Sequence, residues 1–275
     1  MAKRNRKNTK KQIKRRFKEG RGEGTFENYQ PWLRIQDTTS RGLSTRIKGW
    51  KTNRIHQFLS KLELSYFYLL EWSKDVIDIR EQFPLDLPET KAIASELGFK
   101  HPIDPFTQEP IVMTTDFVVT LKKNFYSYEI ARTIKYTEDL CKKRTLEKFE
   151  IEKVYWQNRN INWGIVTEKD INFVSVENIK WLHSYQDRES LPQEITEEHL
   201  CKSLFLIFYL LNKNIFILNQ ITQFCDLELK LSSGKGINIF RYLTANHQFN
   251  IDITKPLNPR KKVCMLHQIT EGDGR

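Results

Sequence analysis

The chain has 275 residues, 39% of them hydrophobic, and a formal net charge of +11. That length allows two modest domains with their own apolar cores, and the longest apolar stretch, residues 204–211, is too short to span a bilayer, which excludes an integral membrane protein. The excess charge is local, because residues 1–22 hold eleven Lys and Arg against one Glu, whereas residues 23–169 hold 22 basic and 21 acidic side chains and residues 170–275 hold 12 of each.

Residues 1–24 are therefore predicted to form a basic arm that is disordered when free, since its like charges repel and it has little apolar surface to bury. DNA is the expected partner, because each cation placed on a phosphate releases a condensed counterion. A solubilising tail is the alternative, and a secretory signal is not expected because no apolar segment follows the charges. The expected DNA contacts are Lys3, Arg4, Arg6, Lys7, Lys10, Lys11, Lys14, Arg15, Arg16 and Lys18.

Residues 25–169 alternate between helical and strand patterns. A helix is predicted over 56–72, where Leu59, Leu62 and Tyr66 recur at helical spacing. Strands are predicted over 76–80, 112–120 and 125–135, with a proline-rich surface loop between the first two, followed by a helix over 137–160 and a strand over 163–167. The intervening Lys-Lys-Asn turn makes the second and third strands an antiparallel hairpin. This order predicts an α/β domain, a mixed sheet flanked by helices.

Residues 170–275 are mainly helical in pattern. Helices are predicted over 176–185, 194–212, 215–224 and 236–245, and two strand-like runs, 248–253 and 262–267, follow as a candidate wing. The order fits a winged-helix-like domain that binds DNA or a partner, and a helical interaction domain without DNA contact is the alternative. The scattered cysteines indicate reduced thiols in a cytoplasmic protein; they are Cys141, Cys201, Cys225 and Cys264.

Three charged side chains in this pattern have the chemistry of phosphodiester hydrolysis, which needs carboxylates for a divalent cation and a positive group near the attacking water. Asp116 lies on the first hairpin strand, Lys135 ends the second, and Glu63 lies on the preceding helix. Restriction-type nucleases use such residues in this order. Thr133, however, occupies the position two before the lysine where an acidic residue is usual, so the spacing alone leaves open that these are plain surface charges.

Several longer runs add specificity. Residues 78–85 (Asp-Ile-Arg-Glu-Gln-Phe-Pro-Leu), 100–102 (Lys-His-Pro), 115–117 (Thr-Asp-Phe), 144–148 (Arg-Thr-Leu-Glu-Lys), 177–182 (Glu-Asn-Ile-Lys-Trp-Leu) and 243–246 (Leu-Thr-Ala-Asn) resemble, in the same order, stretches of the TnsA family of transposon endonucleases. The resemblance extends from about Phe17 to at least Phe249.

The resemblance implies a restriction-endonuclease-like catalytic domain over 25–169 and a winged-helix domain over 170–275. It implies cleavage of the 5′ strands at transposon ends, together with a TnsB-like recombinase of the DDE class and a TnsC-like AAA+ ATPase regulator. The substrate would be double-stranded DNA in the bacterial cytoplasm, close to the nucleoid, and no membrane would be involved. A stand-alone restriction or repair nuclease is one rival, and a DNA-binding assembly factor with a decayed site is another.

Carried over by position, the family's catalytic glutamate, aspartate and lysine fall on Glu63, Asp116 and Lys135. The family's glutamine metal ligand falls on Thr133, whose hydroxyl is shorter and weaker, so the backbone carbonyl of Ile134 is the expected substitute ligand. One or two Mg²⁺ ions are expected because oxygen ligands and phosphate suit Mg²⁺, and Mn²⁺ should substitute.

Overall fold

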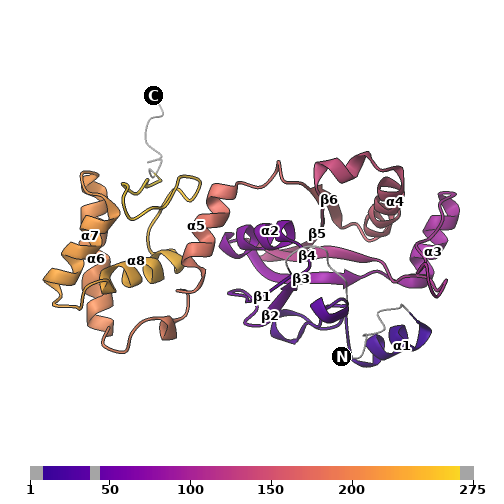
Figure 1. The fold of residues 1–275 in the computed structure, drawn as a ribbon, viewed down its shortest axis with the longest axis horizontal. Coiled ribbons are helices and arrows are strands. Elements are labelled where there is room, and N and C mark those ends of the chain that lie inside the picture. Colours follow the sequence, from indigo (N-terminus) through magenta and orange to yellow (C-terminus); the bar gives the residue numbers. More distant parts are fainter. Residues whose placement is uncertain (1–8, 38–43, 267–275) are drawn as a thin grey trace. The chain divides into compact units, whose positions relative to one another are not determined.

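The computed structural model describes residues 9–37 and 44–266 (Figure 1). The chain divides into two compact units, Met1–Ile171 and Asn172–Arg275, at a point close to the boundary expected at residue 169. Among the described residues, no helix is long and apolar enough to cross a membrane.

A four-stranded mixed sheet forms the centre of the first unit, with the strand order β3-β4-β5-β6. These strands are Val76–Pro84, Thr114–Lys123, Tyr126–Ile134 and Asn162–Val166. The predicted hairpin is present, since β4 and β5 pair antiparallel from Phe117 opposite Arg132 to Lys123 opposite Tyr126. β6 is parallel to β5, which is possible because a helical crossover joins the two strands. The α/β expectation for this unit is confirmed.

Helices and a small hairpin cover the two faces of the sheet. Helix α2 (Lys61–Trp72) and the pair β1 (Thr45–Lys48) and β2 (Ile55–Phe58) pack on one face, where the ring of Phe117 lies 5.5 Å from that of Tyr66. Because successive side chains on a strand point to opposite faces, the neighbouring Val118 joins the other core. That core is made with α3 (Leu87–Glu96) and α4 (Lys143–Gln157).

Three local expectations for this unit were wrong. The helix predicted over 56–72 begins only at Lys61, because His56 and Phe58 are buried on strand β2 and Ser60 caps the helix by accepting a hydrogen bond from the Glu63 N–H. The proline-rich loop contains helix α3, which starts after Asp86, whose side chain accepts from the Glu89 N–H. The helix predicted over 137–160 is shorter and follows the 3₁₀ turn Thr137–Cys141.

The prediction of a disordered arm is wrong for the part that the structure describes. Lys10–Lys18 form helix α1, with a capping box between Thr9 and Gln12. The helix is held on the first unit by Phe17, whose ring lies 4.9 Å from that of Trp32. A local cap and an aromatic anchor therefore outweigh the repulsion of the cations.

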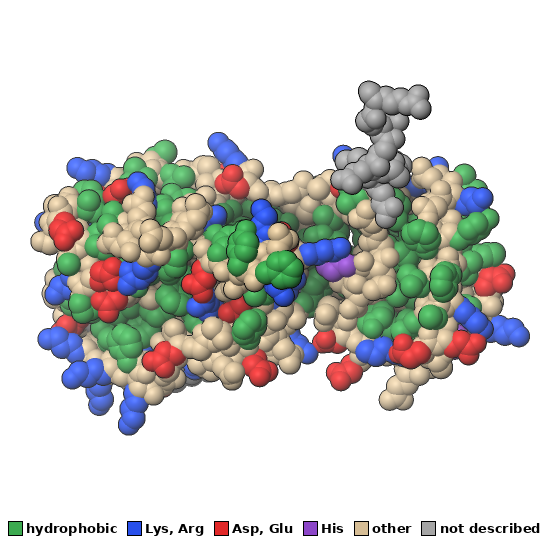
Figure 2. All heavy atoms as spheres, turned by 180° about the vertical axis from the view of Figure 1, so that it is seen from behind, with side chains coloured by type: hydrophobic (Ala, Val, Ile, Leu, Met, Phe, Trp, Pro, Cys, Tyr) green, Lys and Arg blue, Asp and Glu red, His purple; other side chains and the backbone are tan. Residues whose placement is uncertain are grey.

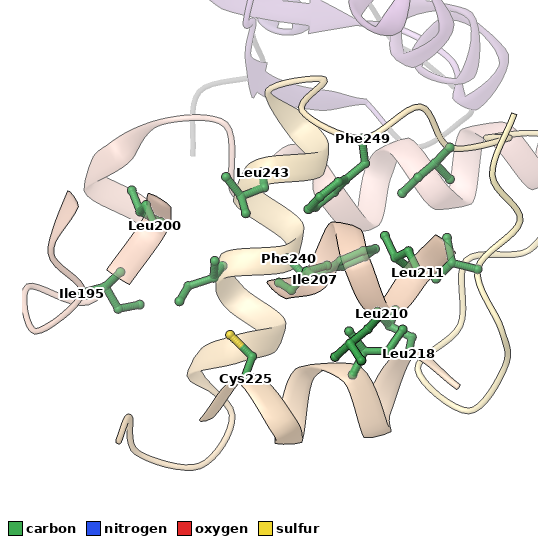
Figure 3. Close-up of a cluster of buried hydrophobic side chains, with 14 of the residues drawn as sticks. Ile195, Leu200, Ile207, Leu210, Leu211, Leu218, Cys225, Phe240, Leu243 and Phe249 are labelled. Carbon is green, nitrogen blue, oxygen red and sulfur yellow. The ribbon is translucent and has the colours of Figure 1, made fainter. Parts of the chain in front are cut away.

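The second unit is mainly helical, as predicted, with helices α5 (Phe173–His183), α6 (Glu197–Lys213), α7 (Leu218–Glu228) and α8 (Lys235–Ala245). Its apolar core draws side chains from α6, α7 and α8 and from the segment that follows α8 (Figure 3); among them are Ile207, Leu218, Phe240, Leu243 and Phe249.

The two strands predicted at the end of the chain are reduced to one bridge among the described residues. Ile251 pairs antiparallel with Met265, the Asp252 N–H donates to the Cys264 carbonyl at 2.8 Å, and the Leu266 N–H donates to the Asn250 carbonyl at 2.7 Å. Residue 267 lies outside the described residues.

Candidate active site

Asp116 lies near the start of β4, where its carboxylate reaches the adjoining strand. Its Oδ2 accepts the backbone N–H of Ile134 at 2.7 Å. Lys135 follows directly, and its own N–H donates to the Val166 carbonyl at 3.0 Å, which extends the pairing of β5 with β6. Backbone pairing therefore fixes the aspartate and the lysine beside each other at one end of the sheet.

Glu63 approaches from the first turn of α2 and is almost fully buried. Its Oε1 accepts from the Ser60 hydroxyl at 2.8 Å, and its Oε2 accepts from the Leu59 N–H at 3.0 Å. Both bonds belong to the helix cap, so Glu63 has a structural role of its own. Each carboxylate oxygen carries two lone pairs, which leaves capacity for a further ligand.

Gln82 connects the two carboxylates, although no sequence pattern had assigned it a role. Its Nε2 lies 3.3 Å from Asp116 Oδ1 and 3.5 Å from Glu63 Oε2. The structure thus brings two of the three predicted catalytic residues to one nitrogen. The only sequence signal was that Gln82 belongs to the run 78–85.

The ammonium group of Lys135 contacts another carboxylate in this structure. Its Nζ lies 3.5 Å from Asp139 Oδ2, in an ion pair whose side chains are 38% and 25% exposed. The lysine charge still acts on the site, since it is among the groups that lower the pKa of Asp116.

Thr133 belongs to a buried network behind Asp116. Its hydroxyl donates to Glu152 of α4 and accepts from the Trp163 indole N–H at 3.3 Å. Glu152 also accepts from the Thr115 hydroxyl, at 2.5 Å. The hydroxyl of Thr133 is thus engaged with Glu152, a buried acidic residue that sequence reasoning missed.

Burial dominates the electrostatics of the three acidic groups. Desolvation, and then the charge of Asp116, raise the pKa of Glu63 well above its usual range. Desolvation also raises the pKa of Asp116, although the Ile134 N–H and the Lys135 charge oppose the shift. It raises the pKa of Glu152 to about 7. A carboxylate pair that is desolvated and mutually repulsive is one that a divalent cation would stabilise.

The donor set fits a particular kind of ion. Among residues 9–37 and 44–266, no group of three or more His, Cys, Asp or Glu side chains is placed to hold a metal. Two carboxylates nevertheless match Mg²⁺, which usually keeps several waters and is bound through one or two carboxylates and the phosphate of the substrate. Within the same described ranges, no nitrogen or sulfur ligand set of the kind that zinc prefers accompanies them.

The cations predicted to contact DNA differ in their surroundings. Lys3, Arg4, Arg6 and Lys7 lie outside the described residues. Five others are exposed or half-buried on α1, namely Lys10, Lys11, Lys14, Arg15 and Lys18. The side chain of Arg16 is only 11% exposed and pairs with Asp37 at 3.9 Å while lying over the Trp32 ring. Arg16 therefore anchors the helix, and its prediction as a DNA contact is unsupported by its position.

A mixed sheet that brings two acidic side chains, Glu63 and Asp116, and a lysine to one end is typical of the class of α/β proteins that cleave phosphodiester bonds. Residues 73–168 match the family described as TnsA-like endonuclease N terminal, and residues 170–253 match TnsA endonuclease C terminal. The chain is 40% identical over 261 residues to the transposon Tn7 transposition protein TnsA of Escherichia coli, covering 95% of this chain and 93% of that protein. The chain belongs to the TnsA endonuclease family.

Proposed function

We propose that the protein is the endonuclease subunit of a Tn7-type transposase and cuts the 5′ strands at the transposon ends in a metal-dependent reaction. The observation that carries this proposal is the convergence of Glu63 and Asp116 on one nitrogen, beside Lys135, in a chain of the TnsA family. A DDE-class recombinase of the TnsB kind would cut and join the 3′ ends, and a TnsC-like ATPase would regulate both.

Each side chain has a part that its position supports. Glu63 and Asp116 would hold one or two Mg²⁺ or Mn²⁺ ions, which supply Lewis-acid stabilisation of the phosphate and lower the pKa of a bound water. The Ile134 N–H keeps Asp116 oriented, and the Ile134 carbonyl remains a candidate ligand. Lys135 would break its ion pair with Asp139 and donate a hydrogen bond to the attacking water or to a phosphate oxygen. There its positive charge would stabilise the negative charge that grows on the phosphate during the reaction.

Duplex DNA and partner proteins would bind different parts of the chain. The exposed cations of α1 suit phosphate contacts, as do by their charge the four cations among residues 1–8. We propose that residues 172–266 form a winged-helix-like unit, with the Ile251–Met265 bridge as a short wing. Residues 170–275 hold 12 basic and 12 acidic side chains, and hydrophobic side chains stand at the surface of the second unit (Figure 2). On α6 and α7 these are Phe205, Phe208, Tyr209, Phe224 and Leu227. Such a surface favours a protein partner over DNA.

End cleavage by the purified protein, with and without the partner recombinase and with Mg²⁺ or EDTA, tests the proposal. The expected result is 5′-strand cutting that needs both the recombinase and the metal. Equal cutting of naked DNA without the recombinase would identify a stand-alone nuclease. End joining by the recombinase, with no 5′ cut under any condition, would identify an assembly factor whose site is inactive.

A further inference from the structure

The backbone of Gln82 is unusual for the middle of a strand. Its φ is 51°, in the left-handed region that non-glycine residues rarely adopt. The residues on either side pair regularly with β4, Glu81 opposite Phe117 and Phe83 opposite Thr115. Gln82 therefore lies across from Asp116, and its carbonyl accepts the Trp32 N–H at 3.2 Å. A strained residue persists only where the surrounding structure holds it, and such residues are frequent at functional sites.

The side-chain amide is oriented by its neighbours. Gln82 is only 3% exposed, and its Oε1 accepts from the Thr114 hydroxyl at 3.3 Å. The NH₂ end faces the carboxylates of Glu63 and Asp116, and an oxygen of each accepts from it. One amide thus offers one donor to each carboxylate.

The two contacts are long for hydrogen bonds. At 3.3 and 3.5 Å they exceed the usual range of about 2.7–3.2 Å for N–H donors. The amide keeps the two anions facing a common position without binding either tightly.

We propose that Gln82 is a positioning residue that holds Glu63 and Asp116 converged on one position and so prepares them to take up a divalent cation. This inference rests on the proposed metal-dependent function and adds a determinant of cation affinity to it. Hydrogen-bond donors that orient metal-binding carboxylates typically change affinity about 10- to 100-fold when they are removed.

A purely structural role for Gln82 is the competing interpretation. The side chain would then serve only to satisfy buried polar groups between β3, β4 and α2, and its removal would lower stability without affecting cation binding beyond any general unfolding. Cation affinity, measured on folded protein, separates the two roles.

Calorimetric titration of Mn²⁺ into the full-length protein is the direct test, with three glutamine variants. Gln82→Met removes the amide at similar length. Gln82→Asn keeps an amide and tolerates a left-handed φ, but it is one methylene too short to serve both carboxylates. Gln57→Met is the matched control, since Gln57 lies on β2 and its amide oxygen accepts the Ile35 N–H at 3.1 Å, outside the site. The expected result is Mn²⁺ binding weakened about 10- to 100-fold in both Gln82 variants and unchanged in Gln57→Met.

Wild-type affinity in both Gln82 variants would overturn the role of Gln82 and leave the metal-dependent function intact, whereas absence of Mn²⁺ binding by the wild-type protein even with duplex DNA present would remove both. If Gln82→Met does not fold, the same titration is made with two other variants, Gln82→Asn and Thr114→Val. The second of these frees the Gln82 amide to rotate, and the two variants then decide the question. Raised Mn²⁺ should also restore end cleavage to Gln82→Met but not to Asp116→Ala; no recovery in Gln82→Met would count against positioning.

Discussion

Thr133→Val tests whether Thr133 stabilises the site through its hydrogen bonds to Glu152 and Trp163 or binds the metal itself. The substitution keeps the shape of the side chain but removes a hydroxyl that donates to Glu152 and accepts from Trp163. It leaves the indole N–H without this acceptor and Glu152 with one hydroxyl donor, Thr115. An unsatisfied buried polar group costs about 1–3 kcal/mol. For a unit of this size, each kcal/mol lowers the melting temperature by about 2–4 °C.

Thermal unfolding of the Thr133 variant should therefore show a melting temperature lower by several degrees, while Mn²⁺ affinity in calorimetry changes little. Tryptophan fluorescence is a suitable probe because Trp163 is part of the network. Thr120→Val is a matched control, since Thr120 is a half-buried residue of β4, and it should shift the melting temperature much less. Weakened Mn²⁺ affinity with unchanged stability in Thr133→Val would refute this reasoning and restore Thr133 as a direct ligand.

Two further predictions concern other parts of the first unit. Glu81 is fully buried and pairs with Arg54 and His56. Desolvation raises the pKa of Glu81, but the charge of His56 and the hydrogen bond from Arg54 lower it more, so the pKa lies far below its usual range. Because the folded-state pKa is depressed, its stabilisation is present above pH 4.5 and is lost as the pH falls below it. Glu81→Gln should lower the free energy of unfolding, measured in guanidinium at pH 7, by about 3–5 kcal/mol. The variant should also lose less stability than the wild-type protein when the pH is lowered to 3.5. Equal acid sensitivity of the two proteins would contradict this. Lys14→Glu with Lys18→Glu should lower the salt dependence of binding to random duplex, by about 0.9 in log–log slope for each phosphate that the protein no longer neutralises. An unchanged slope would show that α1 does not touch DNA.

Much of the fold could be predicted from local sequence patterns. Asp116 and Lys135 could be placed on one hairpin because a period-two pattern and a Lys-Lys-Asn turn are read from neighbouring residues. The strand at 55–58 could not be predicted, because the buried residues His56 and Phe58 happen to continue the helical spacing of the apolar residues of α2. For α1, the sequence contains the capping residues Thr9 and Gln12, but the density of cations in the same segment is typical of disorder.

The finer part of the site depends on pairing between distant segments. Gln82 and Asp116 are 34 residues apart, and only the register of β3 with β4 brings them opposite each other. The left-handed backbone of Gln82 has no signal in sequence, because glutamine has no preference for it. Glu152 lies on a helix that also carries exposed charges, so its burial follows from the way α4 packs on the sheet.

Glu63, Asp116 and Lys135 are proposed to form the site that cuts DNA. Strand-specific cleavage of transposon ends in Mg²⁺, with the partner recombinase present, tests this proposal most directly. Asp116→Ala and Lys135→Ala should each slow 5′-strand cutting about 10²- to 10⁴-fold while circular dichroism shows an unchanged fold. Lys122→Ala, an exposed lysine of the same hairpin, should cut at the wild-type rate. Wild-type cutting by both site variants would contradict the assignment.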